Sequence, residues 1–381
     1  MQENKSLPRF SEFEFLKALA IIGLPLVHVM EDAISEGLAS GPLKSFGLGI
    51  VGLTAFGPSV FMICMGFGIG GGRMSGDSIR KTGIQFLLIS LMLNFVRGLL
   101  PGVVKQLALG DGFYEQFLYF LQSDIYSFVG LFLFCYSFFK KRQIRTFWLL
   151  PVSLITLTVN TLLTPLMPRI FSNSAVARFM GNFIYVDKHS VFPLLSWAIF
   201  PTVGLILGEV LKKNDEEFHR TFMKQMLICS AVFLLAFVIF LRTYDLDVMK
   251  ILVSPVNNSI TDLPNVLLLI PLACVLIGGA YYLCRAIANT RFMSYMMKIS
   301  TYIVPFYLLQ WILIEWTVQL AVVFRFPAGG FGFAHYWILV FLVMAICLYV
   351  CSRHGMKIMR WITKITKVRK KHKKGGKAVA Q

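Results

Sequence analysis

Long apolar runs separated by short polar connections set the pattern of this chain. Ten runs are long enough to cross a bilayer: residues 13–31, 47–71, 80–100, 122–139, 145–164, 190–211, 222–242, 264–284, 300–324 and 333–352. A helix of about 20 apolar residues spans the ~30 Å hydrocarbon core. The pattern therefore predicts an all-α, polytopic integral membrane protein with about ten transmembrane helices.

Basic residues fall on alternate connections between these runs. They gather at 73–81, 140–145, 212–224 and 285–298, and again in the C-terminal tail. Acidic residues such as Asp111, Glu115, Asp245 and Asp262 lie in the intervening connections. Because basic loops are retained in the cytoplasm, both termini are expected to be cytoplasmic, and the acidic connections are expected to lie outside.

Composition supports a multi-pass protein of the cytoplasmic membrane. Hydrophobic residues make up 56% of the chain, and soluble domains average about 45–50%. We expect one membrane domain, 1–352, followed by a basic cytoplasmic tail, 353–381. The tail holds eleven Lys or Arg residues and no acid within a net charge of +18. So close to a membrane span, such a tail favours binding to anionic lipids over nucleic acid.

The cysteines indicate neither disulfides nor a metal site. All seven lie in or at the ends of apolar runs, and none forms a Cys-x-x-Cys pair. Cysteines with this distribution are expected to pack as small hydrophobic side chains.

The first apolar run contains polar residues at helical spacing. Lys17 and His28 fall on one face of a helix, about 16 Å apart along its axis, and Glu14 and Asp32 lie near the same line. A charge facing lipid is costly, at least ~2.5 kcal/mol at the bilayer centre. These four residues, named here the polar stripe, should therefore face protein or a water-filled passage.

The stripe and several later segments resemble acyltransferase family 3, bacterial membrane enzymes that O-acylate surface sugars, and the related heparan-α-glucosaminide N-acetyltransferase catalytic domain. The matching segments are Glu14-x-x-Lys17-x10-His28, Gly57–Gly68, Ser123–Leu131, Phe192–Trp197 with Gly204 and Gly208, and Ile299–Trp311. Glu14 and Lys17 stand where the signature has Asp and Arg, and Gln310 stands where many relatives have His. The resemblance implies acyl transfer from acyl-CoA, expected to be acetyl-CoA, to a glycan or glycolipid.

Three residues are candidates for catalysis. His28 can act as a base or a nucleophile, because imidazole exchanges protons near neutral pH; packing between helices is its alternative role. Asp32, one turn later, could orient the imidazole or lie solvated at the helix end. Asp124 matches a family aspartate, and it could equally serve only as a helix N-cap.

Other residues are candidates for binding the two substrates. Anion contacts to the cytoplasmic acyl donor are expected from Arg9, Lys17, Arg73, Arg80 and Lys81. The loop arginines could instead be topology signals only, and Lys17 could simply pair with Glu14. The acceptor is expected to contact Asp187, His189, Gln310, Trp311 and Glu315, although Asp187 and His189 could belong to an ordinary wet loop.

Two other functions fit the same sequence. The polar stripe could line the path of a transporter or flippase for a lipid-linked saccharide, with no covalent chemistry. Alternatively, the basic tail could recruit partners to the membrane. The sequence contains no Walker loop, Gly-x-Ser-x-Gly or His-Glu-x-x-His motif, so it does not indicate an NTPase, a serine hydrolase or a zinc protease of those types.

Overall fold

The computed structural model describes residues 9–39, 41–54, 56–110, 113–171, 175–186, 191–246, 248, 262–325 and 331–365. These residues are almost entirely helical, and the only β pairing among them is an isolated bridge between Ala39 and Phe331. The helices are α1 (Ser11–Ser35), α2 (Gly41–Thr54), α3 (Gly57–Ile69), α4 (Gly76–Asn94), η1 (Phe95–Leu99), α5 (Leu100–Leu109), α6 (Phe113–Phe120), α7 (Ile125–Lys141), η2 (Thr146–Trp148), α8 (Leu149–Leu163), α9 (Met167–Ile170), α10 (Ala175–Met180), α11 (Leu194–Trp197), α12 (Ile199–Lys213), α13 (Glu216–Thr243), α15 (Leu263–Ala286), α16 (Arg291–Ser300), α17 (Ile303–Val323) and α18 (Phe333–Ile365).

Eight helical segments within the described ranges are long and apolar enough to cross a membrane. They are Ser11–Ser35, Gly76–Leu109, Thr146–Leu163, Leu194–Lys213, Glu216–Thr243, Leu263–Ala286, Ile303–Val323 and Phe333–Lys364. Each overlaps one of the ten expected spans. The other two expected spans, 47–71 and 122–139, correspond to the interrupted pair α2–α3 and to the 17-residue α7. The fold is thus that of a polytopic, all-α membrane protein.

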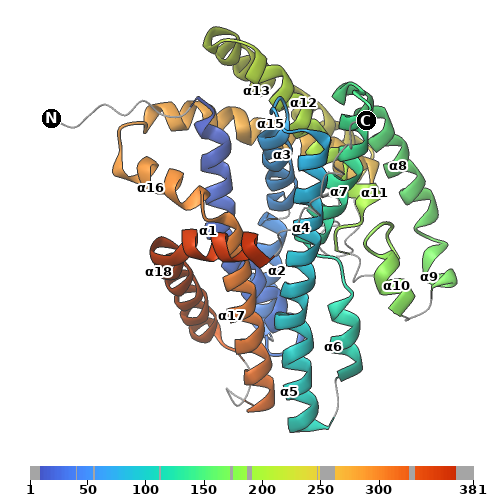
Figure 1. The fold of residues 1–381 in the computed structure, drawn as a ribbon, viewed down its shortest axis with the longest axis vertical. Helices are drawn as coiled ribbons and strands as arrows, with labels where there is room; N and C mark the ends of the chain where they lie inside the picture. Colours follow the sequence, from blue (N-terminus) through green and yellow to red (C-terminus); the bar gives the residue numbers. More distant parts are fainter. Residues whose placement is uncertain are drawn as a thin grey trace, which may run out of the picture.

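Helix α1 is the central element of the bundle. It packs against α2, α3, α15, α16, α17 and α18, and in Figure 1 it runs down the view between these neighbours. Its apolar side chains are buried; Phe13 and Ile21, for example, are almost completely covered. Because α1 carries the polar stripe, this position brings the stripe against several other helices.

Helix α4 continues through a π-helical turn, η1, into α5. The expected span 80–100 is therefore part of a longer rod that ends at Leu109, where Gly110 adopts φ +81°. The connection at 101–121, expected to lie outside the membrane, is largely helical as α5 and α6. A π turn contains a wider loop of backbone than an α turn and is frequent at functional sites. In this rod it places Arg97 in the interior.

Helices α3 and α12 approach closely through paired glycines. Gly66 and Gly70 on α3 lie against Pro201 and Leu205 of α12, and Gly204 of α12 lies in turn against α3. A Cβ added at Gly66 would stand 2.1 Å from the carbonyl oxygen of Pro201. Small residues four apart allow such backbone contact in membranes, so these glycines fix the spacing of the two helices.

The boundary expected at 352/353 lies inside a continuous helix. Helix α18 extends from Phe333 to Ile365 without a break, so the first part of the expected basic tail is helical and continuous with the last span. Its 33 residues correspond to about 50 Å of helix, more than the ~30 Å hydrocarbon core. Residues 366–381, which complete the expected tail, lie outside the described residues.

Candidate functional site

The polar stripe of α1 faces two C-terminal helices. Near the start of α1, Oε2 of Glu14 accepts a hydrogen bond from Ser300 of α16 at 2.8 Å. Further along, His28 contacts Gln310 of α17, 2.9 Å away. The expectation that the stripe turns towards protein is therefore confirmed by its hydrogen bonds.

His28 is held by an amide and an aromatic ring. Nε2 of Gln310 lies 2.9 Å from Nδ1 of His28, and the imidazole stacks on Trp311 with ring centroids 4.0 Å apart. Tyr307 meets the ring edge-on. Gln310 is completely buried, whereas His28 keeps part of its surface uncovered. Gln310 and Trp311, two of the expected acceptor contacts, are thus brought directly to the candidate catalytic histidine.

Gln310 occupies Nδ1 of His28, so only Nε2 of the ring is left for Asp32 to orient. The Asp32 carboxyl approaches that of Glu315 closely enough to form a hydrogen bond. Oε1 of Glu315 also accepts a hydrogen bond from Gln319 at 3.2 Å. Asp32 and Glu315 therefore form a carboxyl pair one turn beyond His28, and Glu315, which was expected to contact the acceptor, is engaged by Asp32 and Gln319.

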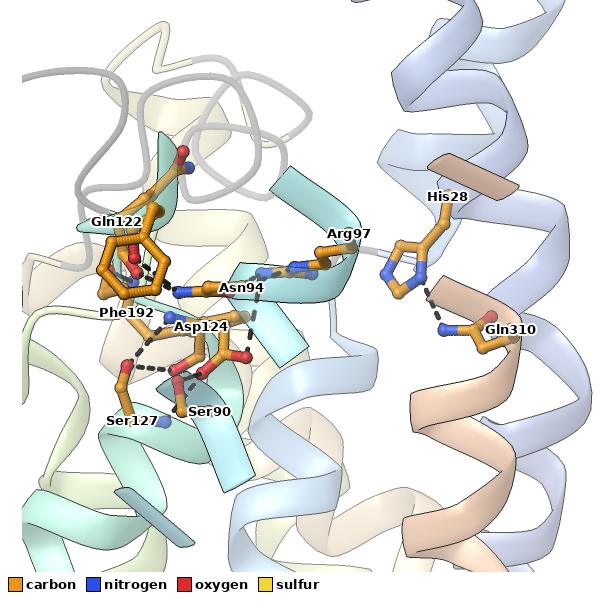
Figure 2. Close-up of polar contacts among 11 residues, drawn as sticks. His28, Ser90, Asn94, Arg97, Gln122, Asp124, Ser127, Phe192 and Gln310 are labelled. Atoms are coloured by element: carbon orange, nitrogen blue, oxygen red, sulfur yellow. Dashed lines mark hydrogen bonds and ion pairs between the residues drawn. The ribbon is translucent and has the colours of Figure 1, made fainter. Parts of the chain in front are cut away.

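Arg97 joins the two halves of the site, and the sequence reasoning missed it. Its side chain is 3% exposed and is bound to Oδ1 of Asn94 by two hydrogen bonds. The guanidinium lies 4.6 Å from the Trp311 ring centroid and 3.7 Å from Oδ2 of Asp124. Figure 2 shows it between His28 and Asp124. A lone arginine inside an apolar run was the available signal, since such residues mark functional sites in membranes.

Asp124 is the N-cap of α7 and forms a capping box with Ser127. Its Oδ1 accepts hydrogen bonds from Ser90, at 2.6 Å, and from the backbone N–H of Ser127, at 2.7 Å. The structural role expected for Asp124 is thus present. Asp124 is also 3.7 Å from Arg97, which lies between Asp124 and His28 in Figure 2, so Asp124 is placed to position this cation.

Arg9 is engaged in contacts between helices. It donates hydrogen bonds to the carbonyl oxygens of Leu211, at 3.2 Å, and Asn214, and it forms an ion pair with Glu216 at 3.7 Å. These contacts tie the start of α1 to the connection between α12 and α13. Arg9 would have to exchange at least one of these partners to contact an anionic donor.

The other expected donor contacts are spread over two elements. Lys17 forms an ion pair with Glu14 at 2.7 Å, the structural alternative recognised in the sequence. Arg80 pairs with Asp77 at 3.5 Å, and Arg73 and Lys81 are exposed. Arg80 and Lys81 lie in the first turns of α4 and Arg73 precedes this helix, whereas Lys17 lies on α1.

One cavity lies apart from the His28 cluster. Asp187 and His189 lie outside the described residues. A cavity of about 20 Å³ lies between α16, α17 and α18, with Tyr302, Phe306 and Cys351 among its lining residues. Ligand pockets occupy ~300–1,000 Å³, so this cavity does not accommodate an acyl-CoA, and none of its lining residues belongs to the His28 cluster.

Comparisons with known proteins give no relative for this chain: no protein-family model, no curated protein and no solved structure matches it. The chemistry of the site therefore has to be argued from the side chains themselves.

Proposed function

We propose that this protein is an integral-membrane acyltransferase that transfers an acyl group, acetyl in the simplest case, from cytoplasmic acyl-CoA to a glycan or glycolipid acceptor. The observation that carries the proposal is the setting of His28. The imidazole lies inside a membrane helix, is hydrogen-bonded to Gln310 and stacks on Trp311, and the residue as a whole is only partly buried. An imidazole held in a fixed position is what proton transfer or nucleophilic attack needs.

Gln310 can set which nitrogen of His28 is the base. With its Nε2 donating to Nδ1, the neutral imidazole carries its proton on Nε2. A half-turn of the amide places Oε1 against Nδ1, so that Nδ1–H donates and Nε2 becomes free to take a proton. Oε1 of Gln310 has no hydrogen-bond partner among the described residues in the first orientation. The second orientation would satisfy it and would leave the imidazole basic.

Arg97 supplies a positive charge beside this imidazole. Its charge acts on His28 as well as on Asp32 and Glu315. Attack on a thioester carbonyl places negative charge on the carbonyl oxygen, and a fixed cation in a poorly hydrated site stabilises that charge. In the overall transfer, the C–S bond of the donor breaks, a C–O or C–N bond to the acceptor forms, and the acceptor proton passes through His28 to the thiolate.

The arrangement of charges supports a cytoplasmic donor and a membrane-bound protein. The basic residues Arg9, Lys17, Arg73, Arg80 and Lys81 lie near helix ends that we assign to the cytoplasm from the loop charges. The basic final turns of α18 and the residues after them would hold this face to anionic lipid. The acceptor would reach His28 from the opposite side, past Trp311 and Glu315.

The proposal is tested by acetyl transfer from labelled acetyl-CoA in proteoliposomes containing the purified protein. We expect His28→Ala to lower turnover by about 10²–10⁴-fold, the usual contribution of a positioned acid–base residue. His354→Ala changes an exposed histidine on α18 and should leave turnover unchanged. Full activity in His28→Ala would remove this residue from the mechanism.

A transporter or flippase for a lipid-linked saccharide is the second candidate. The carboxyl pair of Asp32 and Glu315 favours it, because ionisable pairs inside the membrane also occur on transport and proton pathways. Saccharide movement across proteoliposomes without any requirement for acyl-CoA would support this function. The same preparation can be used for both assays.

A further inference from the structure

A line of polar side chains runs inward from the Glu36 end of α1. Lys105 of α5 donates to Oε2 of Glu36 at 3.1 Å, and Nε2 of Gln319 donates to Oε1 of Glu36 at 2.9 Å. The same Nε2 reaches Oε1 of Glu315 at 3.2 Å, and Glu315 adjoins Asp32. Helices α5 and α17 lie against each other, and both extend to the bottom of the view in Figure 1.

Exposure falls from Glu36 to Glu315, and Asp32 beside Glu315 is half-buried, with its Oδ2 covered. The side chains of Glu36 and Lys105 are 21% and 17% exposed, whereas Gln319 and Glu315 are only 4% and 5% exposed. Glu36 is therefore the most exposed member of the four, and Glu315, with Asp32 beside it, lies at the other end of the line. Gln319 holds the outer and inner carboxyls in one line through its two hydrogen bonds.

The inner carboxyl pair is arranged to hold a proton. Two ionised carboxylates repel each other, so close contact favours one proton between them. A second feature points the same way: Oε1 of Gln319 has no hydrogen-bond partner among the described residues, and neither does Oδ2 of Asp32. A protonated carboxyl group beside either oxygen would donate a hydrogen bond to it.

The neighbouring charges come from three elements. Helix α1 contributes His28, Glu31 and Glu36, η1 contributes Arg97, and α5 contributes Lys105. Lys105 is already paired with Glu36, and Arg97 lies 3.7 Å from Asp124. The acids of this region therefore outnumber its cations, and a bound proton reduces the excess negative charge.

We propose that Asp32 and Glu315 form an intramembrane proton-binding site that exchanges with the solution through Glu36. The site would set the charge one turn from His28. It does not depend on the acyl-transfer proposal, because proton binding can be observed without turnover and would serve a transporter equally well.

The test is infrared difference spectroscopy of the full-length purified protein between about pH 5 and 8. We expect a carboxylic-acid C=O band that is lost in both Asp32→Asn and Glu315→Gln, because the two groups share one proton. Asp77→Asn removes an exposed carboxylate in the first turn of α4 and should keep the band. Glu315→Asp, which retains a carboxyl group, should shift the band without abolishing it. Persistence of the unshifted band in all three site variants would overturn the site.

Proton exchange through Glu36 is tested separately, by following the same carboxylic-acid band after a pH jump. Glu36→Gln keeps the shape of the side chain. It places an amide N–H donor where a carboxylate oxygen accepted a hydrogen bond from Lys105 or Gln319, and we expect this change to block exchange. We expect the band to remain and its rate of change to fall by at least about tenfold, or ~1.4 kcal/mol in barrier. A wild-type rate would overturn exchange through Glu36. Dependence of the band on sodium at constant pH would identify a cation site and would also overturn the proposal.

Discussion

At the scale of single residues, the connection between Arg97 and Asp124 organises the site. Both residues are 3% exposed, and the guanidinium also lies over Trp311. Asn94 fixes the arginine, and Ser90 fixes the aspartate. Removing one partner of a buried ion pair leaves the other charge uncompensated, which costs far more than the pair itself contributes. The pair therefore matters for stability as well as for charge near His28.

We predict that Arg97→Leu lowers the free energy of unfolding by about 3–5 kcal/mol. Asp124→Asn retains a capping side chain, and combining it with Arg97→Leu should cost less than the two single changes together, by ~1 kcal/mol or more. Denaturant unfolding in detergent measures this cycle. Arg80→Leu, from an exposed pair with Asp77, should cost only about 0–1 kcal/mol. Additive losses at Arg97 and Asp124 would contradict the coupling.

At the scale of helices, backbone contact between α3 and α12 holds part of the bundle rigid. Gly66, Gly70 and Gly204 each face backbone of the opposite helix, whereas Gly68, on the same helix α3, faces open space. Lipid tails are as apolar as the helices, so close packing is what favours association in a membrane. Gly66 and Gly68 are thus a matched pair for testing the contact.

Gly66→Ala should destabilise the protein by about 1–3 kcal/mol, because the new methyl group would meet the Pro201 carbonyl and force the helices apart. Gly68→Ala should be neutral or stabilising by up to about 1 kcal/mol, since alanine is the better helix former. Thermal unfolding in detergent compares the two. Equal effects of the two substitutions would show that α3 and α12 are not in contact here.

At the scale of the whole molecule, loop charge and acidic connections determine the expected orientation. An epitope inserted after Thr243 should be labelled on intact cells. An epitope between Arg73 and Ser75, or at the C-terminus, should be labelled only after permeabilisation. The reverse pattern would invert the orientation and would move the Glu36 end of the proton site to the cytoplasm.

The sequence predicted the helical membrane fold and the direction of the polar stripe, because hydropathy and helical spacing are local properties. Gln310 and Trp311 followed from the family resemblance. The contact between Asp32 and Glu315 could not be predicted, since no local pattern states which turn of α17 faces which turn of α1. Arg97 was visible as a charge in an apolar run, but its neighbours depend on the π turn.

The number of residues in the π-helical turn at Phe95–Leu99 determines how α5 is rotated relative to α4. A π turn accommodates one more residue than the α-helix it replaces. Deleting a single residue there would restore regular winding and rotate all of α5 by about 100°. Lys105 would then leave Glu36, although neither residue had been altered. The length of this short segment, and not only its composition, thus determines which face of α5 is turned towards Glu36.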